Sequence, residues 1–145
     1  MRPLLAATAA FSLTAFLALS PAAAGPTPAP EGAEAYIVSP EDGATVSSPV
    51  TVVFGLKGMG VAPAGIDKEM TGHHHLLVDT PMLSGEDLDY SIPADENHIH
   101  FGGGQTETTL ELEPGTHTLQ LLLGDQNHVP HSPPVASDVV TITVE

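Results

Sequence analysis

Short runs of alternating apolar and polar residues, separated by turn-forming residues, recur along the chain from Ala35 onward. Side chains alternate between the two faces of a strand, so these runs predict half-buried β-strands joined by Pro-, Gly- and Asp-containing turns. No stretch sustains the 3.6-residue apolar period of an amphipathic helix. The pattern predicts seven strands, at residues 35–38, 50–56, 73–79, 97–101, 108–112, 116–123 and 138–144.

Seven short strands with frequent turns are typical of an all-β, immunoglobulin-like antiparallel β-sandwich of about seven strands. A helix is the alternative only in residues 61–71 and 84–89. His117 stands near the start of the penultimate strand, where such sandwiches place an aromatic residue that hydrogen-bonds upstream backbone. We therefore interpret His117 as structural.

The first 24 residues have the pattern of a cleavable signal peptide. Arg2 precedes an apolar run over 4–19, and Ser20-Pro21 and three alanines ending at Ala24 follow it. Crossing a membrane takes about 20 apolar residues, and this run is shorter. We expect cleavage near Ala24, a flexible Pro/Gly-rich tether over 25–34 and one His-rich domain over 35–145. The product would be periplasmic or secreted, with no membrane span.

The composition narrows the classes of partner. The chain carries 18 acidic residues against three basic ones, and its net charge of −15 becomes −16 once Arg2 is removed. Nucleic acids and anionic membranes attract basic surfaces, so neither is an expected partner. The absence of cysteine excludes disulfides, cysteine–zinc sites and the blue-copper type of site. A strongly negative charge favours the attraction of cations.

Eight histidines are the main chemical signal of the chain. On a strand, residues i and i+2 share a face, so His73 pairs with His75 and His98 with His100. His128 and His131 follow on a Pro-rich loop at one end of the expected sandwich. Neutral imidazole binds copper, zinc and nickel. The predicted metal ligands are therefore His73, His75, His98, His100, His128 and His131.

Other side chains supply further candidate ligands or partners that orient a ligand. Met59, Met70 and Met82 flank the histidine-rich strand, and thioethers select cuprous copper, which favours copper first and zinc second. The same methionines are equally well explained as flexible core residues. The additional candidates, for ligation or for orienting a ligand, are His74, Met59, Met70, Asp79, Glu107 and Asp125.

The chain contains four distinctive motifs: GHHHLLVD (72–79), HIHFGGGQTE (98–107), PGTHTLQLLLGD (114–125) and HVPHSPPVASD (128–138). Together they resemble a family of small exported bacterial proteins classified as domain of unknown function 4399. The resemblance covers residues 46–144 and implies that all eight histidines are motif residues. It implies no ligand assignment and no activity.

Two better-understood classes of sandwich are useful contrasts. Copper carriers of the CopC type also combine an exported sandwich with His and Met ligands, but this chain resembles them only in general character. Copper–zinc superoxide dismutase is similar in its HxH strand, yet it guides its anionic substrate with an arginine. The domain after residue 24 has no arginine, and its negative charge would repel superoxide.

Three functions remain open from the sequence. The first is extracytoplasmic metal binding through the clustered histidines, in storage, delivery or tolerance. The second is an interaction module for another envelope protein, in which the histidines form a structural network or a pH sensor. The third is a metal-dependent redox enzyme or hydrolase, which needs an open coordination position. We expect a binding protein rather than an enzyme, because no spacing indicates nucleophilic catalysis.

Overall fold

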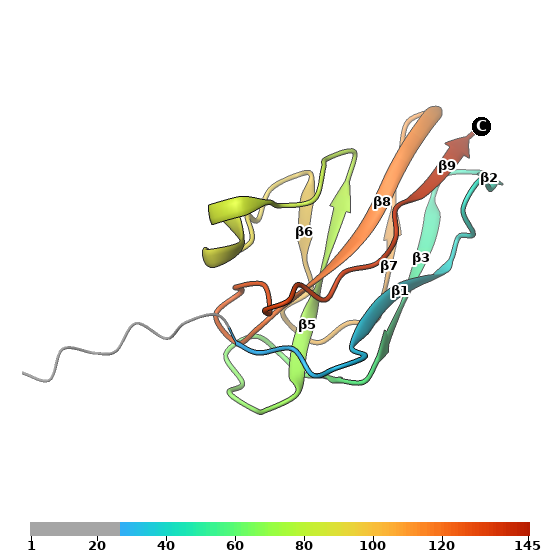
Figure 1. Cartoon of the computed structure of the whole chain (residues 1–145). Coiled ribbons are helices and arrows are strands. Elements are labelled where there is room, and N and C mark those ends of the chain that lie inside the picture. The colour runs from blue at the N-terminus through green and yellow to red at the C-terminus, as the bar shows by residue number, and fades with distance from the viewer. Residues whose placement is uncertain (1–26) are drawn as a thin grey trace, which may run out of the picture.

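The fold is a sandwich of two β-sheets, seen in a computed structural model that describes residues 27–145 (Figure 1). The first sheet has the order β1-β3-β7, and the second has the order β2-β9-β8-β5, with β4 and β6 both paired to the free edge of β5. The strands are β1 (Glu34–Ser39), β2 (Thr45–Val46), β3 (Val50–Lys57), β4 (Gly60–Val61), β5 (Thr71–Val78), β6 (His98–His100), β7 (Glu107–Leu110), β8 (Gly115–Gly124) and β9 (Val140–Val144).

The predicted all-β sandwich is confirmed. Each of the seven predicted strands has a counterpart among the described residues, and the two further strands, β2 and β4, are only two residues long. These two also make the parallel pairings, β2 with β9 and β4 with β5, whereas the other pairings are antiparallel. Residues 61–71 form no helix, and Gly85–Asp89 form a short 3₁₀ helix, η1.

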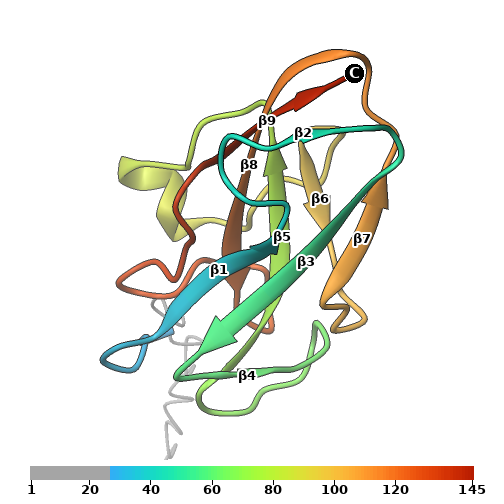
Figure 2. The same ribbon diagram turned by 90° about the vertical axis from the view of Figure 1, so that its right-hand side faces the viewer.

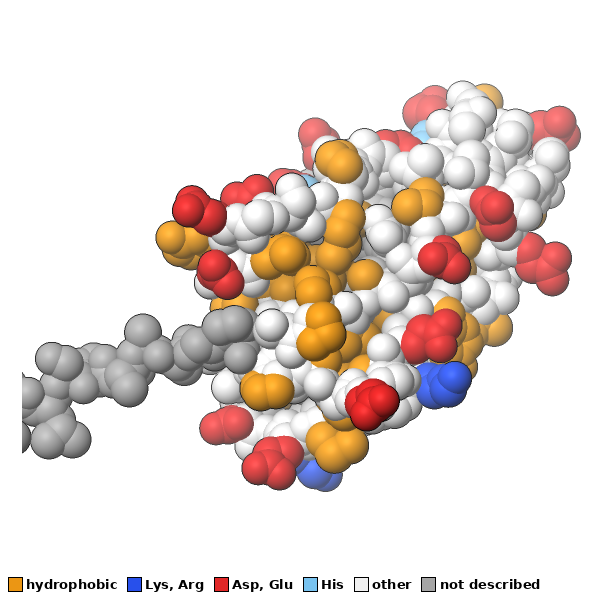
Figure 3. Space-filling view, viewed as in Figure 1, with side chains coloured by type: hydrophobic (Ala, Val, Ile, Leu, Met, Phe, Trp, Pro, Cys, Tyr) orange, Lys and Arg blue, Asp and Glu red, His pale blue; other side chains and the backbone are white. Residues whose placement is uncertain are grey.

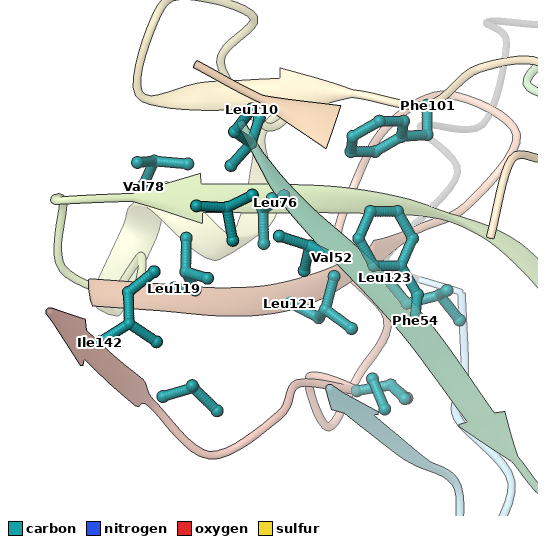
Figure 4. Packing of buried hydrophobic residues seen from close by; sticks show 14 of the residues in the cluster. Val52, Phe54, Leu76, Val78, Phe101, Leu110, Leu119, Leu121, Leu123 and Ile142 are labelled. Atoms are coloured by element: carbon teal, nitrogen blue, oxygen red, sulfur yellow. The ribbon is translucent and has the colours of Figure 1, made fainter. Parts of the chain in front are cut away.

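The core lies between the sheets and is built from the inward faces of alternating strands. From β3, Val52 and Phe54 pack against the inward residues of β5 and β8, including Leu76 and Leu121 (Figure 4). Strand β3 is rich in β-branched residues, which suit a pleated, half-buried surface. Figure 2 shows the same arrangement from the side, with β3 lying across β5.

Strand β5 is unusual because it is buried on both faces. Its inward face carries Leu76 and Val78, while Leu77 on the outward face packs with Ile92 and Leu122 in a second apolar cluster. Loop segments between β5 and β6 supply Ile92 and the neighbouring Met82, so they cover part of this outer face. The histidines of β5 therefore lie in a strand with no solvated side.

The predictions for the N-terminus extend beyond these residues. The expected signal peptide, residues 1–24, lies outside the described residues. The described part of the expected tether hydrogen-bonds to the loop after β8: the Ala29 amide donates to the carbonyl of Ser132, and the Ser132 amide donates to that of Thr27. Within the described residues, no helix is long and apolar enough to span a membrane.

Candidate metal centre

Three histidines meet on the outer face of the second sheet. His73 and His75 are alternate residues of β5, and His100 of β6 lies directly opposite His75 in the strand register. One ring nitrogen from each of the three lies within 4.8 Å of the other two. The i, i+2 spacing on β5 and the HxH spacing on β6 thus bring their rings to one place, as the alternation of strand side chains requires.

A fourth ring, that of His128, comes from the loop after β8. Its centroid lies 4.7 Å from that of His100, 5.1 Å from that of His73 and 6.1 Å from that of His75. We call His73, His75, His100 and His128 the histidine cluster. Its two inner rings, His73 and His75, are fully buried, whereas His100 and His128 are partly exposed.

The inner rings lack the hydrogen bonds that buried polar groups usually make. Both nitrogens of His73 and Nδ1 of His75 have no partner in the described part of the chain. Leaving a buried polar group unpaired costs about 1–3 kcal/mol, so such groups are rare without a functional reason. A cation bound among these nitrogens would supply a partner for one nitrogen of each ring.

Burial also keeps the inner rings neutral. It lowers the pKa of His73 to about 4, with the neighbouring His100 and His128 adding to the effect and Asp125 opposing it. Burial, then His73, His100 and His128, lower the pKa of His75 to about 3. The pKa of His100 is lowered by the same two causes, burial and a neighbouring imidazole. At neutral pH these lone pairs are therefore free to bind a metal, which needs deprotonated imidazole.

Two glycines leave the space that these rings occupy. A Cβ at Gly124, the last residue of β8, would lie 2.7 Å from Cε1 of His75 and 3.3 Å from Cα of His128. A Cβ at Gly102, just after β6, would collide with the ring of His100. Sequence reasoning interpreted Gly102 only as part of a bend and did not connect either position to a histidine. The only signal for Gly124 is its place at the end of a leucine-rich strand, which is weak without knowledge of the pairing.

The structure does not bring His131, His74 or His98 to the cluster. His74 and Gly72 lie on the inward face of β5: the His74 ring is 5.2 Å from that of Phe54, and the His131 ring lies against Gly72. His98 shares the outward face of β6 with His100, but it is one pair further along, opposite Leu77. Nδ1 of His98 is hydrogen-bonded to Oδ1 of Asp95 at 2.9 Å.

The remaining candidate residues lie elsewhere. Met59 packs against the main core, Met82 packs in the second apolar cluster, and Met70 is 57% exposed. Glu107 is on β7 in the opposite sheet. The donor set at the cluster is therefore imidazole, and the thioether argument for copper does not extend to it.

Asp79 and His117 form a separate polar pair. His117 donates from Nδ1 to the Asp79 carboxylate at 2.7 Å and from Nε2 to the carbonyl of Glu113 at 2.8 Å. These two acceptors, Asp79 first, raise the pKa of His117. Both of its nitrogens are engaged in binding β8 to the residues around it, so this ring is not available to a metal.

The fold and the cluster define a class: a small, acidic β-sandwich with buried imidazoles grouped on one face of a sheet. The chain belongs to the family described as a domain of unknown function (DUF4399), which matches residues 52–145. This match spans all eight histidines and strands β4 to β9, and it leaves out β1 and Thr27. No curated protein and no solved structure matches the chain.

Proposed function

We propose that this protein is an exported metal-binding protein that holds one ion, copper first and zinc second, at His73, His75 and His100 with His128 beside them. Its role would be metal storage, delivery or tolerance outside the cytoplasm. The observation that carries the proposal is the pair of buried inner rings, His73 and His75, whose unpaired nitrogens lie within reach of His100. Neutral imidazoles in this number suit copper, zinc or nickel.

Copper is placed first because imidazole is a suitable ligand for copper and because copper, unlike zinc, can bind nitrogen donors in two oxidation states. Zinc is second because it accepts histidine ligands in the same number. The acidic surface supports the capture of either cation: Figure 3 shows acidic side chains scattered over one face of the molecule. The leader-like first 24 residues support a place outside the cytoplasm.

A structural histidine network fits the cluster less well. In such a network the buried ring nitrogens would be hydrogen-bonded to each other or to backbone. Among the described residues, His73, His74 and His131 leave both of their ring nitrogens unpaired, and His75 leaves one. Buried rings with so few hydrogen bonds lower the stability of the fold, whereas a bound ion would give one nitrogen of each ring at the cluster a partner.

A competition titration of residues 25–145 with Zn²⁺ and with Cu⁺ tests the proposal. We expect one tightly bound ion per chain, and a loss of affinity of at least about 100-fold in the His73→Ala/His75→Ala double variant. His98→Ala is the matched control, because His98 lies on the same face outside the cluster and should leave the affinity unchanged. Equal binding by the double variant and the control would overturn the proposal.

A further inference from the structure

The ring centroids of the histidine cluster are spaced like the corners of a tetrahedron, although the ring nitrogens that lie within 4.8 Å of one another come only from His73, His75 and His100. With metal–nitrogen distances of about 2.0–2.1 Å, four imidazoles bound tetrahedrally would have ring centroids about 5.2 Å apart. In a square plane, neighbouring rings would be about 4.5 Å apart and opposite rings about 6.4 Å apart. The observed separations are 4.7, 4.8, 5.0, 5.1, 5.1 and 6.1 Å. A square plane needs two long separations between opposite rings, and only the one from His75 to His128 is long.

The loop that carries His128 is held in an unusual conformation. His128 has a φ of 68°, in the left-handed region that non-glycine residues seldom adopt. Such backbone persists only where its surroundings impose it, and it is concentrated at functional sites. The conformation is not a consequence of a loose loop, because the amide of His128 donates to the carbonyl of Asp125 and its own carbonyl accepts from the amide of Ile92.

The side chain of Asp125 organises this loop. Asp125 is only 4% exposed, and its Oδ1 accepts from the amides of Asn127 at 2.8 Å and Val129 at 3.0 Å, on either side of His128. Its other oxygen, Oδ2, accepts from the hydroxyl of Thr27 at 2.6 Å. A buried carboxylate with all of these partners fixes the backbone on both sides of the ring-bearing residue.

Thr27 belongs to the first described residues, which run beside the loop after β8 (Figure 1). The backbone bonds between Thr27, Ala29 and Ser132 hold this segment in place. The contact therefore ties the start of the domain to the loop that carries the fourth ring, across 98 positions of sequence. Asp125 lies close enough to His73 to influence its pKa, and a negative charge there would attract a cation to the cluster.

We propose that His128 is the fourth ligand of a closed, tetrahedral four-imidazole site, and that Asp125, held by Thr27, positions it. This inference rests on the proposed function. A tetrahedral set of four nitrogens suits Zn²⁺ and cuprous copper, whereas divalent copper and nickel prefer planar or tetragonal sets. Since the protein supplies all four positions, the site resembles closed sites that hold a metal rather than catalytic ones that keep a position open.

X-ray absorption of the zinc-loaded protein, together with the visible spectrum of the cobalt-loaded protein, tests the proposal. We expect four imidazoles around zinc and the intense absorption of tetrahedral cobalt. In His128→Ala, the imidazole number should fall to three and zinc affinity should fall about 10- to 100-fold. Thr27→Val removes the hydroxyl donor, so it should shift the cobalt spectrum and weaken zinc binding, and Thr27→Ser should restore both.

Thr51→Val is the matched control, because Thr51 is an exposed residue of β3 in the other sheet. If His128→Ala keeps four imidazoles and its affinity while His73→Ala loses the ion, the inference fails and the proposed function stands. If Thr27→Val and Thr51→Val give the same spectrum, the positioning role fails. If the unaltered protein and His73→Ala bind zinc equally weakly, the proposed function itself fails.

Discussion

The ring of His75 lies against Gly124, so closely that a Cβ at this glycine would be 2.7 Å from Cε1 and 3.2 Å from Nδ1 of the imidazole. Strand β8 ends at this glycine, opposite His73 in the register with β5. The space for the inner rings is thus made by a missing side chain on the neighbouring strand. Because of this contact, a substitution of the glycine should alter the site while leaving every histidine in place.

Gly124→Ala should displace the His75 ring and lower both stability and metal affinity. Added atoms in a packed site typically cost about 1–3 kcal/mol, and the added Cβ would also lie only 3.3 Å from Cα of His128, on the backbone of the neighbouring loop. Urea unfolding and zinc competition measure the two effects. Gly60→Ala is the control, because its Cβ would meet Thr71 at an ordinary 3.5 Å. Equal zinc affinity in the two variants would contradict a metal site packed against Gly124.

The variant His74→Leu tests whether the inward histidine of β5 differs in role from its two outward neighbours, His73 and His75. His74 lies in the main core beside Phe54, and both of its nitrogens are unpaired. Replacing an unpaired buried polar ring with an apolar side chain of similar size should leave stability unchanged or raise it by about 1–2 kcal/mol. Zinc affinity should not change. Loss of the ion in this variant would place His74 among the ligands, although its side chain lies on the inward face of β5.

The metal-free protein should lose stability as the pH falls from 7.5 to 5. Burial lowers the pKa of His73 and His74 to about 4 and that of His75 to about 3. The unfolded chain, with ordinary histidines near 6.5, therefore binds more protons than the folded one in this range. For each ring, the free energy of unfolding should therefore fall by about 2 kcal/mol between pH 7.5 and pH 5.

Urea unfolding at several pH values checks this dependence. Because the three histidine pKa values are lowered in the folded state, stability should fall with the pH until the pH reaches those values, near 4. Carboxylates begin to contribute there as well. The slope should decrease in His74→Leu, which removes one of the three rings. A midpoint that stays constant between pH 7.5 and 5 would show that these rings are solvated rather than buried.

His117 should have the opposite pH dependence. Asp79 and then the carbonyl of Glu113 raise its pKa, so its contribution is complete below 6.5 and is lost as the pH rises through the folded value. Asp79 is 41% exposed, so screening limits the effect to about 1 kcal/mol. His117→Gln should therefore destabilise the protein more at pH 6 than at pH 8.5, as measured by urea unfolding. An equal loss at both values would indicate a neutral, purely packing role for the ring.

The sequence predicted the strands well because the sheets follow simple alternation. The two-residue period places Leu76 and Val78 inward together with His74, and it places His73 and His75 together outward, as observed. Alternation gives the face on which a side chain lies, but it does not give the residue that lies opposite on the neighbouring strand. His98 shares its face with His100 but lies opposite Leu77, beyond reach of the inner rings.

Loops were harder to predict, because their side chains follow no period. His128 and His131 are three residues apart on one loop, yet one lies in the cluster and the other lies against Gly72 on the inward side of β5. The bonds within the loop from the Asn127 and Val129 amides to Asp125, and the positive φ of His128, set the course of this loop, and no alternation of side chains predicts them. The contact from Thr27 to Asp125 joins residues 98 positions apart, so no local pattern predicts it.

The most direct measurement is anomalous diffraction from crystals of residues 25–145 grown with zinc or with copper. We predict one strong anomalous peak on the outer face of β5, bound by ring nitrogens of His73, His75, His100 and His128. A peak held by surface carboxylates, or by His98 or His131 without the β5 pair, would contradict a metal centre at the histidine cluster.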